Sequence, residues 1–284
     1  MINFFCIIFL LFCNEVFADE EAPDFIATVY EIQKGDTLYE IAYEFDLGLD
    51  EILRANPQIQ DVDFVNYGQK IILPTTHIIP KLEKREGIVI NLAEPRMYFF
   101  FGNEIETFPV AIGADEKTPL GETKIIRKRK NPAWIPPLSI REENPELPEI
   151  IPAGPDNPLG KYALNLDYSQ SLKWKRVIIH GTNLSTSIGG KVSHGCIRLY
   201  PWDIEELFLS VKIGTPVKIV SQPVKVDEVV GAPYLEVHAK KSLASTKKLI
   251  CERFSDCEDD IDWVKVEKVL KQKLGVPFMI GVRD

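Results

Sequence analysis

The chain has 284 residues, of which 45% are hydrophobic and 26% are charged, and its formal net charge is −9 at pH 7. This length suggests about two domains, and the apolar content is sufficient for a packed core. The acidic balance argues against nucleic acid as a partner, since nucleic-acid binding needs clustered positive charge. The one basic run, residues 124–130, is too local to change this and is interpreted as a basic hairpin or a local anion contact.

Residues 1–18 are predicted to be a cleaved secretory signal. The apolar run from Phe4 to Phe12 is too short to span a bilayer, and Val16 and Ala18 are side chains that a signal peptidase accepts. We expect cleavage after Ala18, although the segment lacks the usual Lys or Arg before the apolar run. A lipoprotein is the minor alternative, but Phe12 stands before Cys13, where a lipoprotein needs a small residue.

Residues 27–74 show the order strand, helix, helix, strand. Alternation predicts a strand over 28–32, helical spacing of apolar residues predicts helices over 38–45 and 49–55, and a strand closes the segment at 71–73. The letters KGDTLYEIA, LRANPQI and GQKIILP resemble a LysM domain, a family that binds glycans containing N-acetylglucosamine, such as peptidoglycan. The alternative is a purely structural α+β module.

The LysM resemblance implies glycan contacts from two loops. Those loops supply Gly35, Asp36, Thr37, Asn56 and Pro57. If the module only binds glycan, deleting residues 27–74 should weaken binding to sacculi and spare turnover of a soluble peptide.

The rest of the chain divides into three further segments. Residues 75–86 are a Pro-containing, charged linker. Residues 87–221 hold many short β-branched and aromatic runs between Gly, Pro and Asn turns, which predicts a mostly-β, closed or sandwich-like domain with one helix over 201–209. Residues 222–284 form an extension with a strand at 234–238 and a helix at about 262–274.

Among the cysteines, Cys196 is the one without an obvious disulfide partner in the sequence. Cys251 and Cys257 are close enough in sequence to bridge each other, although the sequence leaves this open, and an odd count after export leaves one thiol over. An unpaired thiol in an oxidising compartment is open to unwanted oxidation, so its presence favours a catalytic role. Cys196 has His180 and His194 nearby in the sequence, and Gly195 permits a tight turn whose N–H groups suit an oxyanion hole.

Other interpretations of these residues are weaker. Two His and one Cys lack a fourth zinc ligand, so we expect no metal and no cofactor. A papain-type peptidase has its Cys before its His, whereas His180 precedes Cys196 here.

The segments HGT and SHGCIRLY, with KTPLGETKIIRKRKNPAWIPP and PWDIEELF around them, resemble the L,D-transpeptidase (YkuD-type) catalytic domain. The resemblance implies a periplasmic enzyme with a β-sandwich-like fold that acts on peptidoglycan stem peptides. By resemblance, Cys196 is the nucleophile, His180 the general base and the Gly181 carbonyl its orienting partner. The N–H groups of Gly195 and Cys196, with His194, are implied to form the oxyanion hole.

The resemblance also implies substrate contacts and partners. Substrate contacts are assigned to Ser193, Arg198 and Tyr162, with a structural salt bridge as the alternative role of Arg198. The acceptor is left open between a diaminopimelate amine, a Lys of an outer-membrane lipoprotein and water, which would make the enzyme a carboxypeptidase. The Pro-rich residues 131–160 are expected to form loops over the cleft, and carbapenems are expected to acylate Cys196. The rival from another class is an inactive peptidoglycan-binding protein.

Overall fold

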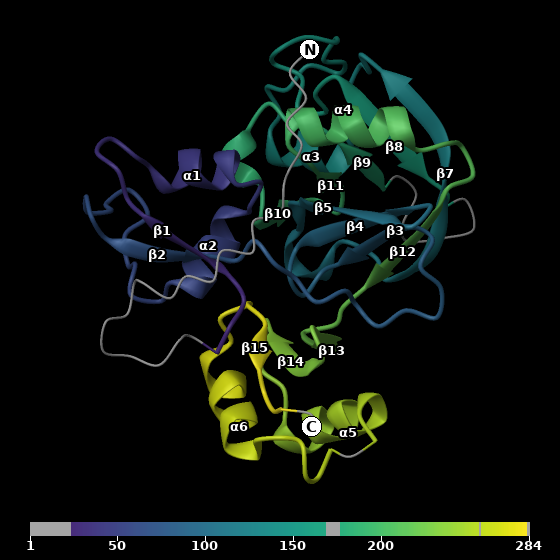
Figure 1. Cartoon of the computed structure of the whole chain (residues 1–284). Coiled ribbons are helices and arrows are strands. Elements are labelled where there is room, and N and C mark those ends of the chain that lie inside the picture. Colours follow the sequence, from purple (N-terminus) through teal and green to yellow (C-terminus); the bar gives the residue numbers. More distant parts are fainter. Residues whose placement is uncertain (1–23, 169–176, 256, 283–284) are drawn as a thin grey trace.

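The computed structural model describes residues 24–168, 177–255 and 257–282. Figure 1 shows three parts: a small N-terminal module, a large β domain and a C-terminal unit below both. The predicted signal segment lies outside the described residues. Among the helices that are described, none is both long and apolar enough to cross a bilayer.

The N-terminal module has the predicted βααβ order. Its elements are β1 (Thr28–Glu31), α1 (Leu38–Glu44), α2 (Leu49–Ala55) and β2 (Lys70–Leu73). The two strands pair antiparallel, from Thr28 opposite Leu73 to Glu31 opposite Lys70. Helix α1 begins where the Thr37 hydroxyl accepts a hydrogen bond from the Glu40 N–H, which is the usual N-cap arrangement.

The large domain is built on one mixed eight-stranded sheet. In order of pairing the strands are β11 (Ile197–Arg198), β9 (Ile178–His180), β8 (Tyr162–Leu166), β7 (Gly121–Lys130), β12 (Pro216–Val220), β3 (Gly87–Asn91), β4 (Arg96–Phe101) and β5 (Glu104–Pro109). β11 runs parallel to β9, and β12 runs parallel to β3, whereas the other neighbours are antiparallel.

Strand β7 makes the sheet curl. Its first residues, Gly121 to Lys124, pair with β12, and its later residues, Ile125 to Lys130, pair with β8. The register shifts between Ile125 and Arg127, as at a β-bulge, and bulges bend and twist a strand. The result is a curled half-barrel, so the prediction of a mostly-β catalytic domain after a βααβ module is confirmed.

Helix α4 (Pro201–Ser210) packs on this sheet against β8. Pro201 occupies its first turn, where a missing N–H costs nothing, and Ile204 and Leu207 are buried beneath it. A short parallel pair, β6 (Ile112–Gly113) with β10 (Lys191–Ser193), and the short helix α3 (Leu138–Glu143) lie in the connections.

The C-terminal unit has a core of its own. It comprises β13 (Val224–Val229), β14 (Ala232–Val237), α5 (Leu243–Arg253), α6 (Trp263–Gln272) and β15 (Phe278–Met279). The sequence predicted β14 and α6 but not the other three elements. Cys251 and Cys257 form a disulfide against this core, which answers a question that the sequence left open.

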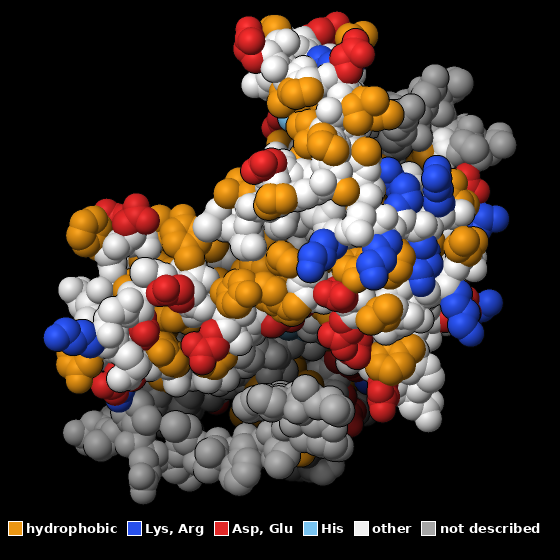
Figure 2. Space-filling model, turned by 90° about the horizontal axis from the view of Figure 1, so that it is seen from above, with side chains coloured by type: hydrophobic (Ala, Val, Ile, Leu, Met, Phe, Trp, Pro, Cys, Tyr) orange, Lys and Arg blue, Asp and Glu red, His pale blue; other side chains and the backbone are white. Residues whose placement is uncertain are grey.

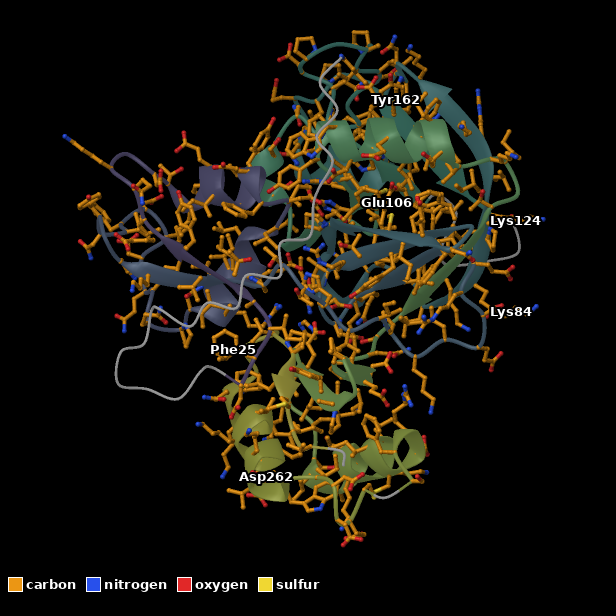
Figure 3. The ribbon with its side chains drawn as sticks, viewed as in Figure 1. Phe25, Lys84, Glu106, Lys124, Tyr162 and Asp262 are labelled. Carbon is orange, nitrogen blue, oxygen red and sulfur yellow. A yellow bond between two sulfur atoms is a disulfide. The ribbon has the colours of Figure 1, made fainter. Side chains whose placement is uncertain are left out.

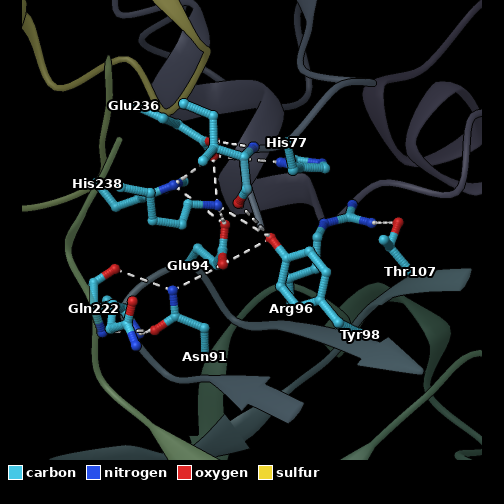
Figure 4. Close-up of polar contacts among 12 residues, drawn as sticks. His77, Asn91, Glu94, Arg96, Tyr98, Thr107, Gln222, Glu236 and His238 are labelled. Atoms are coloured by element: carbon cyan, nitrogen blue, oxygen red, sulfur yellow. Dashed lines mark hydrogen bonds and ion pairs between the residues drawn. The ribbon is translucent and has the colours of Figure 1, made fainter. Parts of the chain in front are cut away.

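A buried polar cluster joins the sheet to the C-terminal unit (Figure 4). The Lys225 ammonium pairs with Glu94 and lies 2.9 Å from Glu236 Oε1, and His238 Nε2 lies 2.7 Å from the same oxygen. Glu94 comes from the turn after β3, whereas the other three come from β13 and the end of β14. The C-terminal unit is therefore held by fully buried charges and not by apolar packing alone.

Candidate active site

The parallel pairing of β9 and β11 brings the two ends of the HGT–SHGCIRLY stretch together. His180 stands opposite Arg198 in this register, and Cys196 immediately precedes β11. Both His180 and Cys196 line one cavity of about 510 Å³. His180 and Cys196, which are sixteen positions apart in the chain, therefore line the same cavity.

His180 is buried and held by its neighbour's backbone. Its Nδ1 lies 2.6 Å from the Gly181 carbonyl oxygen. A carbonyl can only accept, so Nδ1 carries the proton and Nε2 keeps its lone pair. Burial, with the Arg198 and Arg129 guanidiniums, lowers the pKa of His180 to about 3. The imidazole is therefore neutral over the whole physiological range, in the tautomer that a general base needs.

Cys196 forms no disulfide with any other described residue. Burial raises the pKa of its thiol, while a backbone hydrogen bond with Ile178 and the Arg198 charge act in the opposite direction. The resting pair is therefore a neutral thiol and a neutral imidazole. Such a thiol becomes a good nucleophile only when a base takes its proton during the attack.

The turn before Cys196 is fixed by Ser193. The Ser193 hydroxyl donates to the Cys196 carbonyl at 2.6 Å and accepts from the Gly195 N–H at 3.0 Å. Gly195 has a φ of +116°, and a β-carbon there would lie 2.7 Å from the Lys117 carbonyl oxygen, so only glycine fits. The structure corrects two expectations here. The Gly195 N–H, which was assigned to the oxyanion hole, is hydrogen-bonded inside the turn. Ser193, which was assigned to substrate contact, is buried, and its hydroxyl braces that turn.

His194 points to the Pro-rich segment 131–160. Its Nε2 lies 2.9 Å from Glu143 Oε2, at the end of α3. At the base of the same segment, the buried Asn157 amide donates to the carbonyls of Pro132, Ile151 and Pro152. The segment also supplies Trp134, Ile135 and other walls of the cavity, so it covers the site as expected.

Tyr162 lies away from the cavity, contrary to expectation. Its hydroxyl donates to Glu205 on α4 at 2.6 Å, and its ring packs on Phe208. Figure 3 labels Tyr162 beside this helix. Successive side chains of a strand point to opposite faces, so Tyr162 and Leu164 face the helix while Asn165 faces the cavity. The cavity wall on β8 is therefore Asn165.

Arg198 lines the cavity, as expected, and two further arginines join it. Arg127 and Arg129 reach the same space from β7, where they stand two positions apart on one face. The Arg129 Nε donates to Asn165 Oδ1 at 3.0 Å. The sequence carried a signal for them in the alternation within KIIRKRK, but the fold was needed to bring β7 beside the Cys.

The proposed glycan loops of the LysM-like module are only partly exposed. Gly35, Thr37 and Pro57 are on the surface, and Asp36 accepts hydrogen bonds from the Tyr30 hydroxyl and the Gln33 N–H. Asn56 is buried, and its side-chain amide bonds to the Ile52 and Ile72 backbone. Its side chain holds the helix α2 end to β2 and is not available to a glycan.

Within the described part of the chain, one group of side chains has the spacing of a metal site: His77, Glu94 and Glu236. The Lys225 ammonium already lies between the two carboxylates and supplies the positive charge there. This group is better described as an ion-pair cluster.

Comparison with known proteins finds similarity over most of this chain. Residues 85–219 match the family model of the L,D-transpeptidase catalytic domain, and residues 30–74 match that of the LysM domain. The chain is 37% identical over 264 residues to the probable L,D-transpeptidase ErfK/SrfK of Salmonella typhimurium, covering 86% of this chain and 82% of that one. It is 34% identical over 279 residues to the probable L,D-transpeptidase YbiS of Escherichia coli, covering 89% and 87%.

Among solved structures, L,D-transpeptidase 3 of Mycobacterium tuberculosis in complex with a faropenem-derived adduct is 19% identical. The match covers 48% of this chain and 60% of that chain, with a TM-score of 0.34.

Proposed function

The chain belongs to the L,D-transpeptidase family and acts on peptidoglycan, and we propose that it does so in the periplasm by a two-step acyl transfer through Cys196. The observation that carries this proposal is the shared cavity of Cys196 and a neutral His180 whose Nδ1 proton is held by Gly181. The predicted export signal supports the compartment.

In the first step the Cys196 sulfur attacks the carbonyl carbon at the L-centre of diaminopimelate, the third stem residue. His180 Nε2 takes the thiol proton as the new carbon–sulfur bond forms. The tetrahedral intermediate then expels the terminal D-Ala, whose amine receives that proton from His180, and a thioester remains on Cys196.

The negative oxygen of the intermediate needs fixed donors close to Cys196. We assign this role to the backbone N–H of Cys196, with His194 at the rim. The Gly195 N–H contributes in a different way, because its bond to Ser193 Oγ fixes the turn that aims the next N–H.

In the second step an amine attacks the thioester carbonyl and gives its proton to His180, and the Cys196 sulfur leaves and is reprotonated. A diaminopimelate side-chain amine would give a 3→3 cross-link, and a Lys of an outer-membrane lipoprotein would give a protein–wall bond. Water would give an L,D-carboxypeptidase, which is the second candidate. An inactive wall-binding protein is disfavoured by the intact Cys196–His180–Gly181 geometry.

The N-terminal module binds the glycan strands of the same substrate, with contacts proposed at Gly35, Thr37 and Pro57 on its exposed loops. Carbapenems should acylate Cys196, because their strained ring presents a carbonyl to the same nucleophile.

The test is the intact mass of the purified mature protein after incubation with a disaccharide-tetrapeptide. We expect release of D-Ala and an adduct that Cys196→Ala lacks and that prior exposure to a carbapenem blocks. The mass of the soluble product then separates cross-linking from hydrolysis. A folded protein that gives neither adduct nor D-Ala would be the inactive binding protein.

A further inference from the structure

A second cavity, of about 680 Å³, lies between the linker and the C-terminal unit. Its floor is formed by residues 221–227, which include the first half of β13, and its two walls are residues 79–85 of the linker and one face of α5. Figure 1 shows β13 above α5, at the outer side of the small sheet. The cavity shares no lining residue with the cavity of Cys196, so it is a separate feature of the molecule.

Strand β13 is an edge strand. It pairs with β14 on one side, and in the part of the chain that the structure describes no strand pairs with its other side. The Pro223 carbonyl accepts from the His238 N–H at 2.8 Å. Because the bonds of an antiparallel ladder alternate, the backbone N–H and C=O groups of Val224 and Val226 point away from β14. Such an edge is a template on which another chain can pair.

The edge is held firmly in place. Val224 and Val226 pack into the apolar core of the C-terminal unit, and the Lys225 ammonium between them is bound in the buried cluster with Glu94 and Glu236. A strand added to this edge would therefore meet a backbone that is already ordered. Preorganisation of this kind lowers the entropic cost of binding.

The groove is rich in positive charge. Apart from Lys225, its lining holds five cations and two acids, namely Lys81, Arg85, Lys241, Lys248 and Arg253 with Asp227 and Glu252. Each acid is shared between two cations. Asp227 lies 2.7 Å from Arg253 and 4.0 Å from Arg85. Glu252 lies 3.1 Å from Lys81 and 4.0 Å from Lys248. The balance favours an acidic ligand, although the chain as a whole carries a net charge of −9.

The same groove also has apolar surface. Leu82 of the linker, Val226 of β13 and Leu249 of α5 line it among the charged side chains. Successive side chains of an extended peptide point to opposite sides, so a peptide that pairs with β13 presents two different rows of side chains to the groove. A segment in which acidic and apolar residues alternate matches this mixture of cations and apolar surface.

We propose that this groove docks an extended acidic segment of a partner protein, which adds to β13 as a fourth strand of the small sheet. Backbone hydrogen bonds to Val224 and Val226 would provide affinity, and the cations of α5 and the linker would select for acidic side chains. This inference goes beyond the proposed function, because the ligand is a protein segment and not the substrate of Cys196. It gives the C-terminal unit a role as a docking module.

The experiment measures binding of labelled synthetic peptides to the mature full-length protein by fluorescence anisotropy. The probe is the peptide EVEVEVE. One comparison peptide, KVKVKVK, reverses the charge, and another, EEEEVVV, keeps the composition but loses the alternation. We expect both to bind at least about 10-fold more weakly than the probe, because each lacks one of the two features that the groove recognises. Equal binding of the three peptides would overturn the proposal.

Two N-methylated forms of the probe test pairing with the strand edge. One carries the methyl group on the nitrogen of the central Val, and the other carries it on the nitrogen of the Glu that follows. In an added strand only one of two neighbouring N–H groups points to β13. One methylated peptide should therefore lose at least about 10-fold in affinity while the other changes little, since only one loses a hydrogen bond. Equal losses would rule out strand addition.

Substitutions then locate the site. Lys241→Glu and Lys248→Glu, both exposed in the wall or at the rim of the groove, should each weaken binding of the probe by about 10-fold. Lys268→Glu, exposed on α6 outside the groove, is the matched control. Lys124→Glu is a second control, because Figure 2 shows Lys and Arg side chains gathered on the side where Figure 1 places β7. Thermal melts confirm that each variant is folded.

Three outcomes would overturn the docking site. The first is that none of the peptides binds. The second is that Lys124→Glu weakens binding as much as Lys248→Glu, which would indicate general attraction to basic surface. The third is that vesicles of phosphatidylglycerol bind through Lys241 and Lys248 whereas the probe does not, which would assign these charges to a membrane surface. Release of D-Ala from disaccharide-tetrapeptide is measured separately, so the proposed function stands or fails independently of this result.

Discussion

Arg96 of strand β4 and Glu51 of helix α2 form a buried two-point ion pair between the catalytic domain and the LysM module. The Arg96 Nε lies 3.0 Å from Glu51 Oε1, and a terminal nitrogen lies 2.8 Å from Oε2. Both side chains are almost completely buried. Burial opposes ionisation of Glu51, yet the Arg96 charge holds the pKa of this carboxyl below its ordinary range.

This pair changes the expected result of removing the module. The same interface brings the backbones of Gly48 and Gly189 together, and a β-carbon on Gly48 would lie 2.5 Å from the Gly189 α-carbon. Gly189 lies just before β10, which leads to Cys196. Deletion of residues 27–74 would expose Arg96 without its partner and remove the support of this loop. We therefore expect a truncated protein with lower stability and lower turnover even of soluble peptide, measured by melting and by D-Ala release.

A single substitution tests the pair directly. Glu51→Gln leaves the buried Arg96 charge unpaired, and breaking such a pair costs about 3–5 kcal/mol. Glu31→Gln, on the exposed face of β1 in the same module, is the matched control and should change the free energy of unfolding by less than about 0.5 kcal/mol. Chemical denaturation measures both. Equal values for the two variants would mean that the ion pair does not hold the module in place.

The two buried histidines should separate catalysis from stability. His180→Gln removes the proposed base, so acylation by tetrapeptide should fall by at least about 100-fold, since general base catalysis contributes about 10²–10⁴-fold. His238→Gln instead disturbs the cluster with Glu94 and Glu236, so it should lower the melting temperature and spare the rate per folded molecule. The assignment of the base fails if His238→Gln loses as much rate as His180→Gln.

The pH dependence of acylation follows from the neutral resting pair. His180 stays unprotonated down to a pH of about 3, so kcat/KM should show no acid limb near pH 6.5. A His180 with the ordinary pKa of a histidine would instead give an acid limb near pH 6.5. Single-turnover rates of D-Ala release from pH 4 to 8 distinguish the two.

The lowered pKa of His180 and the raised pKa of His238 change stability with pH in opposite directions. The unfolded chain protonates His180 below about pH 6.5, whereas the folded protein does so only near pH 3, so this residue lowers stability as pH falls between these values. The carboxylates of Glu94 and Glu236 outweigh burial and raise the pKa of His238, whose contribution is complete below about pH 6.5 and is lost as pH rises through its folded-state value. The difference in melting temperature between wild type and each Gln variant should therefore depend on pH in different ranges. For His180→Gln it should change below about pH 6.5, and for His238→Gln it should change above it.

The sequence predicted what local periodicity and motif spacing determine. The βααβ order and helix α4 follow from such patterns, whereas the pairing of Cys196 with His180 was implied by the family resemblance, and both residues line one cavity. Long-range contacts were harder: Arg127 and Arg129 reach the cavity only because β7 bends from β12 to β8. The oxyanion assignment of Gly195 was incomplete because one bond from a neighbouring hydroxyl redirects its N–H.

The cluster below the sheet allows a last, sharper test of what holds the C-terminal unit. The Lys225 ammonium pairs with Glu94 and Glu236, and all three side chains are completely buried. Lys225→Met keeps the length of the side chain but leaves two buried carboxylates facing each other, so the free energy of unfolding should fall by about 3–5 kcal/mol.

Lys218→Met is the matched control for this test. It breaks a surface pair with Glu122, and such exposed pairs are worth about 0–1 kcal/mol. The loss in Lys225→Met should also shrink at lower pH, because protonation of a carboxylate relieves the repulsion. If Lys225→Met instead unfolds like Lys218→Met, the cluster does not secure the unit, and the disulfide and apolar core of the C-terminal unit must do so alone.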